Sequence, residues 1–143
     1  MTAHSFPQGA ERSRQTILLV EDEPFVREAT CGILEGAGFT VLSAADARSA
    51  VGIYESSAHS IDLVMTDMVL PGQTGEQLGL ELRHRSPEIK VLVTSGYGSP
   101  EYDCDDAGSQ TYFLAKPYSR RNLIEKIERI LHSPLQRPTS QAG

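Results

Sequence analysis

Short apolar segments recur along the chain, and longer segments with apolar residues at intervals of three to four lie between them. The apolar segments cover residues 17–20, 40–42, 61–65, 89–93 and 112–114. Near-continuous apolar runs of this length are typical of strands in a parallel sheet that is covered on both faces. The pattern therefore predicts five strands joined by helices. No internal repeat or low-complexity segment competes with this interpretation.

Amphipathic stripes predict helices over the segment that ends at Gly36, over residues 46–56 and over residues 120–131. Their apolar residues are Val26, Ala29 or Thr30, Ile33 and Leu34 in the first segment, Ala47, Ala50, Val51 and Tyr54 in the second, and Leu123, Ile124, Ile127, Ile130 and Leu131 in the last. The periodicity is clearest in the last segment. Each of these helices can cover a face of the sheet.

Two further helices are predicted from their starting signals. Thr74 and Gln77 have the spacing of a capping box, and this helix ends at residues 83–85, whose basic side chains suit the helix dipole. Ser99 and Pro100 begin a segment that reaches residue 108 and carries few apolar residues. We expect this fourth helix to be short, mobile or partly unwound.

Alternating strands and helices predict an α/β fold with a doubly wound parallel sheet. Residues 1–15 and 133–143 are polar and contain prolines, so we expect them to be flexible tails around one domain at residues 16–132. The chain length suits a single domain.

Composition excludes several classes of function. The net charge of −6 gives no basic surface for nucleic acid, and no apolar run is long enough to span a membrane. The N-terminal segment lacks a secretory signal pattern, so a cytoplasmic protein is expected. The two cysteines and four histidines do not have metal-ligand spacing.

Polar side chains follow the predicted strands. Glu21 and Asp22 follow the first, Asp67 the third, Ser95 the fourth and Lys116 the fifth. The carboxyl ends of parallel strands form the ligand edge of an open α/β sheet. Three carboxylates gathered there repel one another unless a cation joins them, and an all-oxygen ligand set favours Mg²⁺, or Mn²⁺ in its place.

This set of residues is suited to phosphoryl transfer. Asp22 and Asp67 are expected to bind the metal directly and Glu21 through water. A carboxylate can act as the nucleophile toward phosphorus when positive charge stabilises the phosphoryl oxygens. Lys116 and the metal would supply that charge, and the Ser95 hydroxyl would donate to a phosphoryl oxygen.

Four sequence blocks resemble the signatures of response-regulator receiver domains, over about residues 17–131. The blocks are Val20-Glu21-Asp22-Glu23-Pro24, Thr66-Asp67-Met68-Val69-Leu70-Pro71-Gly72, Thr94-Ser95-Gly96-Tyr97 and Lys116-Pro117. Each block is weak alone, but each ends a predicted strand and their order matches the family. The residues around Ser95 and Lys116 resemble those of receivers attached to hybrid histidine kinases.

The resemblance implies roles for individual residues. Asp67 would be the phosphoacceptor, Glu21 and Asp22 the acidic pair, and the Val69 backbone carbonyl a further metal ligand. Ser95 would be the switch hydroxyl and Phe113 the switch aromatic.

The resemblance also implies a flavodoxin-like sheet in the order 2-1-3-4-5 with five helices and a cis Lys116–Pro117 bond. The expected function is a phosphorelay receiver in a two-component system, which takes a phosphoryl group from a histidine kinase or a histidine-phosphotransfer protein and signals to a protein target. Such a domain catalyses its own phosphorylation and dephosphorylation and is not a conventional enzyme.

Other interpretations remain open at the sequence level. Asp67 alone is compatible with a turn-forming residue, Asp22 with a helix cap and Phe113 with simple core packing. An aspartyl-phosphate phosphatase of similar topology would place its nucleophile after the first strand, with a second Asp two residues on, and residues 21–23 lack that pattern. A receiver-like interaction module without phosphorylation is the main alternative.

Overall fold

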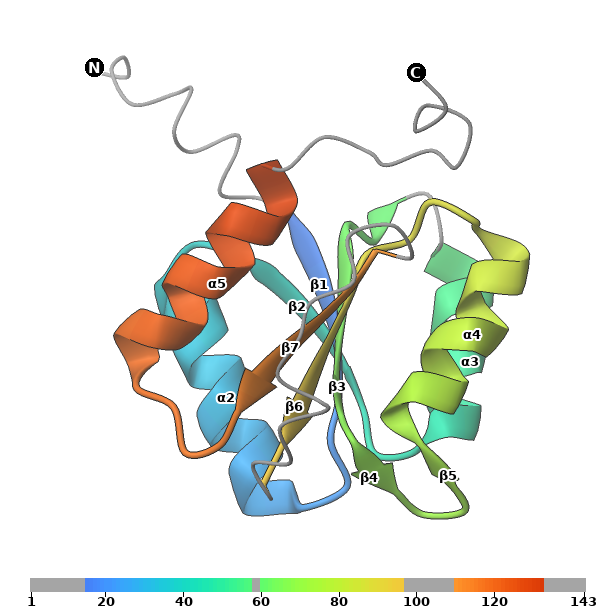
Figure 1. Ribbon diagram of the computed structural model, residues 1–143, viewed down its shortest axis with the longest axis horizontal. Helices are drawn as coiled ribbons and strands as arrows, with labels where there is room; N and C mark the ends of the chain where they lie inside the picture. The colour runs from blue at the N-terminus through green and yellow to red at the C-terminus, as the bar shows by residue number, and fades with distance from the viewer. Residues whose placement is uncertain (1–14, 58–59, 97–109, 133–143) are drawn as a thin grey trace.

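The computed structural model describes residues 15–57, 60–96 and 110–132. Five parallel strands form the central sheet in the order β2-β1-β3-β6-β7. Their bounds are Thr16–Val20 for β1, Thr40–Ala44 for β2, Leu63–Asp67 for β3, Val91–Ser95 for β6 and Thr111–Ala115 for β7. Counted along the chain this is the order 2-1-3-4-5, which confirms the predicted topology (Figure 1).

Within the described residues, four helices cover the sheet. They are α2 (Pro24–Gly36), α3 (Ala47–Ser57), α4 (Gly75–Arg85) and α5 (Arg120–His132). Helices α2 and α5 lie on one face, and α3 and α4 lie on the other (Figure 1). The layers are those of a doubly wound α/β fold.

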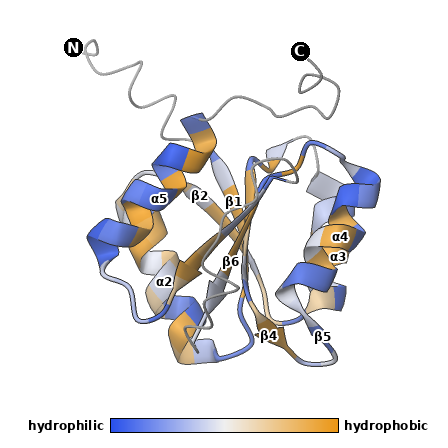
Figure 2. Ribbon diagram, in the orientation of Figure 1, coloured by the Kyte–Doolittle hydropathy of each residue, from blue (hydrophilic) through white to orange (hydrophobic). Residues whose placement is uncertain are grey.

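Each strand supplies apolar side chains to both faces because successive residues point in opposite directions. In β1, Ile17 and Leu19 pack toward α2 and α5, whereas Leu18 and Val20 pack toward α3 and α4. All four are at most 2% exposed. Hydrophobic residues accordingly concentrate on the strands and on the helix surfaces that face them (Figure 2). This two-sided burial explains why the strands read as continuous apolar runs.

The start of α2 excludes one alternative that the sequence left open and corrects one prediction. The helix is capped by Glu23, whose side chain accepts hydrogen bonds from the backbone N–H groups of Phe25 and Val26, so Asp22 is not the cap. Val26 was expected on the buried stripe but is 37% exposed, because it lies in the first turn. Thr30 rather than Ala29 is the buried residue of the next turn.

Helix α4 begins as predicted. The Thr74 hydroxyl accepts a hydrogen bond from Gln77 N at 3.0 Å, and the Gln77 side chain accepts one from Thr74 N at 2.9 Å. This capping box satisfies two backbone donors of the first turn. It fixes where the helix starts relative to the end of β3.

Two strands begin later than the apolar pattern predicted. The strand ranges 61–65 and 89–93 are observed as Leu63–Asp67 and Val91–Ser95. Ile61 and Ile89 are nevertheless buried in the core, at 7% and 5% exposure. Their burial comes from packing outside the strands, which a hydrophobic pattern cannot distinguish from strand pairing.

A two-stranded hairpin after β3 was not predicted. It pairs β4 (Val69–Leu70) with β5 (Gln73–Thr74) in antiparallel fashion, and Gly72 in its turn has φ of +83°. Strands of two residues are too short to show an alternating pattern.

Some predictions lie outside the described residues. They are the helix at residues 99–108, together with residues 1–14 and 133–143 of the two expected tails. Among the helices of the described ranges, none is long and apolar enough to cross a membrane.

Candidate functional site

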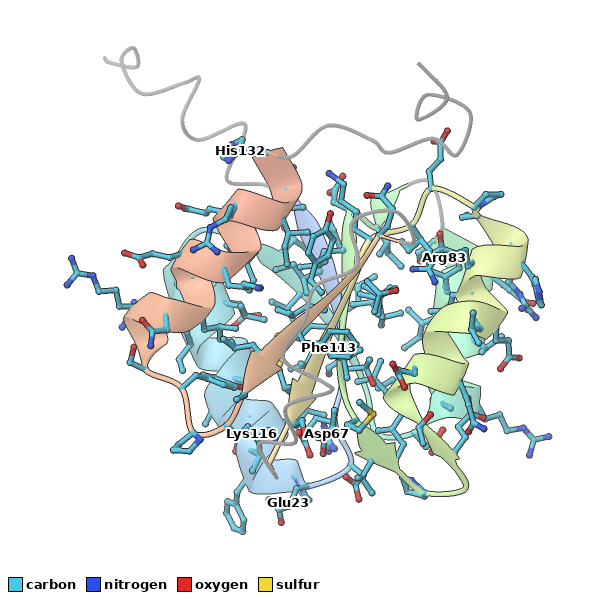
Figure 3. All side chains as sticks on the ribbon, viewed as in Figure 1. Glu23, Asp67, Arg83, Phe113, Lys116 and His132 are labelled. Atoms are coloured by element: carbon cyan, nitrogen blue, oxygen red, sulfur yellow. The ribbon has the colours of Figure 1, made fainter. Side chains whose placement is uncertain are left out.

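The carboxyl edge of the sheet brings together residues from three strand ends. Glu21 and Asp22 follow β1, Asp67 is the last residue of β3, and Lys116 follows β7. Because β3 pairs with both β1 and β6, Asp67 lies near the middle of the sheet. Asp67 and Lys116 lie at the same end of the molecule (Figure 3).

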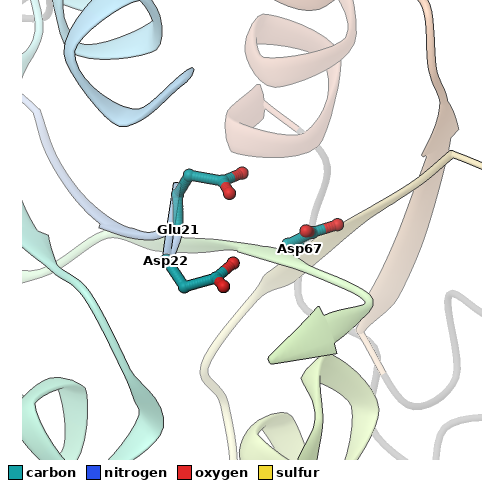
Figure 4. A group of neighbouring side chains, drawn as sticks. All are labelled: Glu21, Asp22 and Asp67. Atoms are coloured by element: carbon teal, nitrogen blue, oxygen red, sulfur yellow. The ribbon is translucent and has the colours of Figure 1, made fainter. Parts of the chain in front are cut away.

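Three carboxylates converge at this edge. One carboxylate oxygen each of Glu21, Asp22 and Asp67 lies within 4.8 Å of the others. Figure 4 shows the carboxylates of Glu21 and Asp22 pointing to the side on which Asp67 lies. Glu21 is buried, Asp67 is half-buried and Asp22 is exposed. The cluster therefore has one side anchored in the protein and one side open to solvent.

Lys116 places a positive charge between two of these carboxylates. Its Nζ lies 3.5 Å from Asp67 Oδ1 and 3.7 Å from Glu21 Oε1. The backbone holds the lysine in place, because Lys116 N donates to the Ser95 carbonyl at 2.7 Å. The following peptide bond, Lys116–Pro117, is cis, as the sequence interpretation expected.

Glu21 is held by contacts on both its side chain and its backbone. Its Oε2 accepts a hydrogen bond from Glu23 N at 3.1 Å, and its carbonyl accepts one from Arg27 Nη1 at 2.7 Å. Burial raises the pKa of Glu21; the hydrogen bond from Glu23 N and the charge of Lys116 oppose that rise, and Asp67 adds to it. Glu21 is thus a fixed side chain whose burial makes its ionisation less favourable.

The donor set fits a small divalent cation. Carboxylate and carbonyl oxygens are the ligands of Mg²⁺, which also retains several waters. Val69 can add a backbone oxygen. The Gly75 N–H donates to Met68 O at 2.7 Å, so Met68 and Gly75 form a hydrogen-bonded pair of the antiparallel ladder. In an antiparallel ladder, pairs that exchange backbone hydrogen bonds alternate with pairs that do not. Val69 and Thr74 form a pair of the second type, so the Val69 carbonyl points away from β5.

The other two predicted residues differ in position. Ser95 ends β6, is 7% exposed and pairs in register with Ala115, next to Lys116. Phe113 lies two residues before Ala115 and packs in the core toward α3 and α4. In Figure 3 it lies in the interior of the sheet, whereas Asp67 and Lys116 lie at the edge. The structure therefore groups Ser95 with the cluster by register, and Phe113 with the core.

Two residues that shape the site were not predicted from the sequence. Arg27 holds the Glu21 carbonyl, and no spacing rule identifies a long side chain that turns back along its own helix. Gly75 is the first residue of α4 and lies against the backbone of Asp67. A glycine in the first turn of a capped helix was the available signal, because glycine lowers helix stability without another reason to be there.

Comparison with known proteins agrees with this geometry. The family described as "Response regulator receiver domain" matches residues 17–128. The sensor kinase CckA of Brucella abortus is 36% identical over 117 residues, which are 81% of this chain, and the response regulator receiver protein CpdR of the same organism is 30% identical over 80% of the chain and 95% of its own length. The crystal structure of the receiver domain from the hybrid histidine kinase CckA aligns with a TM-score of 0.70 at 33% identity, over 82% of this chain and 99% of that domain.

The relatives differ in length. The chain spans 12% of the sensor kinase CckA and about half of the phosphate regulon transcriptional regulatory protein PhoB of Escherichia coli, to which it is 33% identical over 119 residues. The family match at residues 17–128 includes the acidic cluster. The similarity therefore concerns one domain and not the complete relatives.

Proposed function

The chain belongs to the response regulator receiver domain family, and on that premise we propose that Asp67 is the residue that accepts a phosphoryl group in a two-component phosphorelay. The observation that carries the proposal is the placement of the Asp67 carboxylate. It lies within 4.8 Å of two further carboxylates and 3.5 Å from the Lys116 ammonium. A nucleophile, an oxygen-rich cation site and a fixed positive charge meet at one point.

In the proposed step, a carboxylate oxygen of Asp67 attacks the phosphorus of a phosphohistidine on a histidine kinase or a phosphotransfer protein. The new O–P bond forms as the P–N bond breaks, and the histidine imidazole leaves. Lys116 stabilises negative charge on the phosphoryl oxygens from a position already set by its backbone bond to Ser95. The ammonium lies 3.5 Å from Asp67 Oδ1, which places its charge beside the oxygen atoms that take part in the transfer.

Asp22, Asp67 and the Val69 carbonyl would hold a divalent cation directly, with Glu21 bound through water. A bound Mg²⁺ or Mn²⁺ supplies charge neutralisation for phosphoryl oxygens. The protein contributes the arrangement: Glu21 is fixed by Glu23 and Arg27, and Asp67 by the end of β3.

We propose that phosphorylation is read out through Ser95 and Phe113. The Ser95 hydroxyl would donate to a phosphoryl oxygen, and Phe113 would change its packing in the core between the sheet and α3 and α4. A protein target would then bind the changed surface. The functional unit would be the domain at residues 16–132, which would catalyse its own phosphorylation and dephosphorylation.

The proposal is tested by incubating the chain with acetyl phosphate and measuring its intact mass. With Mg²⁺, the parent is expected to gain the mass of one phosphoryl group, and with EDTA it is expected to gain none. Asp67→Asn should remain unmodified. Asp62→Asn is the matched control, because Asp62 lies at the opposite end of β3. A parent that stays unmodified in Mg²⁺ would favour an interaction module without phosphorylation.

A further inference from the structure

The peptide backbone of Asp67 is held from two sides. On the β6 side, Met68 N donates to Thr94 O at 2.7 Å, in the register that pairs Asp67 with Thr94. The Thr66 hydroxyl donates to the Asp67 carbonyl at 3.0 Å. On the other side, the hairpin leads to α4, whose first residue, Gly75, donates its N–H to Met68 O at 2.7 Å.

Gly75 has no room for a side chain. A Cβ atom at this position would overlap the Asp67 carbonyl oxygen and would lie 3.1 Å from the Asp67 carbonyl carbon and 3.0 Å from Thr66 Cγ2. Two of these three atoms belong to the backbone of a strand and cannot rotate away. The φ of Gly75 is not in the left-handed region. Space, and not backbone conformation, therefore requires glycine here.

A second glycine of α4 provides the contrast. Gly79 lies one turn later and is also buried. A Cβ atom there would lie 3.4 Å and 3.6 Å from the two Cγ atoms of Val91, which is close to ordinary contact with a side chain. The same helix thus contains one glycine that touches the backbone of Asp67 and one that faces an adaptable valine side chain.

We propose that Gly75 is a positioning residue for Asp67. By lacking a side chain, it lets the first turn of α4 rest on the Asp67 peptide, and this contact sets the position of the Asp67 carboxylate relative to Lys116 and to the acidic pair. The capping box of Thr74 and Gln77 fixes the helix start that makes this contact. The inference rests on the proposed function of Asp67, and it adds α4 to the elements that determine the geometry of phosphoryl transfer.

The test compares Gly75→Ala with Gly79→Ala, because both replace a buried glycine of α4 by the same residue. A displacement of about 1 Å near reacting groups can lower a rate by about 100-fold. We expect the maximal rate of phosphorylation by acetyl phosphate to fall by about 10- to 100-fold in Gly75→Ala and to stay within about twofold of the parent in Gly79→Ala. The dissociation constant for Mg²⁺, followed by NMR, should rise in Gly75→Ala only. A general loss of stability would not produce this difference in a folded variant.

The double variant Thr66→Ser with Gly75→Ala adds a rescue. Serine keeps the hydroxyl that donates to the Asp67 carbonyl and removes the methyl group that the new Cβ would meet. We expect it to recover part of the rate, with Thr66→Ser alone as the control.

Equal rates and Mg²⁺ affinities in the parent, Gly75→Ala and Gly79→Ala would overturn the inference while leaving the proposed function intact. If both Gly75 variants unfold and Gly79→Ala folds, Gly75 serves the fold as a whole, and the positioning role is rejected. An unphosphorylated parent would instead reject the proposed function.

Discussion

The two ends of the sheet use similar residues for different purposes. The carboxyl edge holds Lys116 among carboxylates, with Nζ within 3.7 Å of two of them. The opposite edge, where the strands begin, is called the amino edge here. It also has a half-buried lysine, Lys90, whose Nζ donates to the Ile130 carbonyl at 3.0 Å. It also has a carboxylate, Asp62, which accepts a hydrogen bond from Thr16 N at 2.8 Å. At this edge, both of these contacts satisfy backbone groups.

The contrast shows that a hollow is not sufficient to identify a site. A cavity of about 310 Å³ lies at the amino edge and is lined by Asp62 and Lys90 among others. The carboxyl edge is distinguished by arrangement: three carboxylates approach one another despite their repulsion, and an ammonium is fixed between two of them. Repulsion of this kind lowers stability unless a ligand relieves it. It therefore marks the edge where a ligand is expected.

The largest effect should separate the two lysines. Lys116→Met removes a positioned charge and keeps most of the side-chain volume, so phosphorylation by acetyl phosphate should slow by about 100- to 1000-fold. Lys90→Met makes the same change at the amino edge and should leave the rate within about twofold. Phosphorylation rates of both variants, measured by intact mass, test the comparison. Equal slowing by both would mean that the edges do not differ as described.

Mg²⁺ should stabilise the protein through one edge only. A ligand that binds only the folded state adds about 2.7 kcal/mol to the unfolding free energy at 100 times its dissociation constant. We expect this gain in urea unfolding of the parent, its loss on adding EDTA, and its absence or marked reduction in Asp22→Asn. Asp62→Asn should keep the full gain. If Mg²⁺ still stabilised Asp22→Asn but no longer stabilised Asp62→Asn, the cation would bind at the amino edge, which would contradict this prediction.

Removing the amino-edge carboxylate should cost stability without affecting activity. Asp62→Ala deprives Thr16 N of its acceptor, and one such hydrogen bond contributes about 0.5–1.5 kcal/mol. The unfolding free energy should fall by that amount, while the phosphorylation rate of the folded protein stays unchanged. A slower rate in the folded variant would show that the two edges are coupled.

The smallest effect concerns pH. Burial lowers the pKa of Lys90 in the folded state, so the unfolded chain binds more protons over a range just below the normal lysine pKa. The stability of the parent relative to Lys90→Met should therefore rise as pH increases through that range. Urea unfolding of both proteins at neutral and alkaline pH measures this difference. If the stability of the parent relative to Lys90→Met fell as pH increased, this would contradict the lowered pKa of Lys90 in the folded state.

The extent of sequence prediction also differs between regions. The strand order followed from the family resemblance. The five strands and the residues of the acidic cluster followed from the pattern, because apolar runs and strand ends obey simple geometric rules. The start of α4 followed from Thr74 and Gln77 for the same reason, since capping depends on neighbours in the sequence. In these cases, local chemistry is enough.

The remaining features depend on contacts between distant segments. Ile61 and Ile89 are buried without belonging to strands, so apolar character placed the strand starts two residues too early. Gly75 acts through its proximity to Asp67, eight residues away across the hairpin, and glycine alone does not reveal what it touches. Such contacts become visible only when the chain is folded.

The most direct test of the central claim identifies the modified residue itself. After reaction with acetyl phosphate and Mg²⁺, borohydride reduces an aspartyl phosphate to homoserine, which peptide mass spectrometry can locate. We predict homoserine at position 67 in the parent and none in the sample treated with EDTA. Homoserine at position 22, or its absence from the phosphorylated parent, would contradict the assignment of Asp67 as the phosphoacceptor.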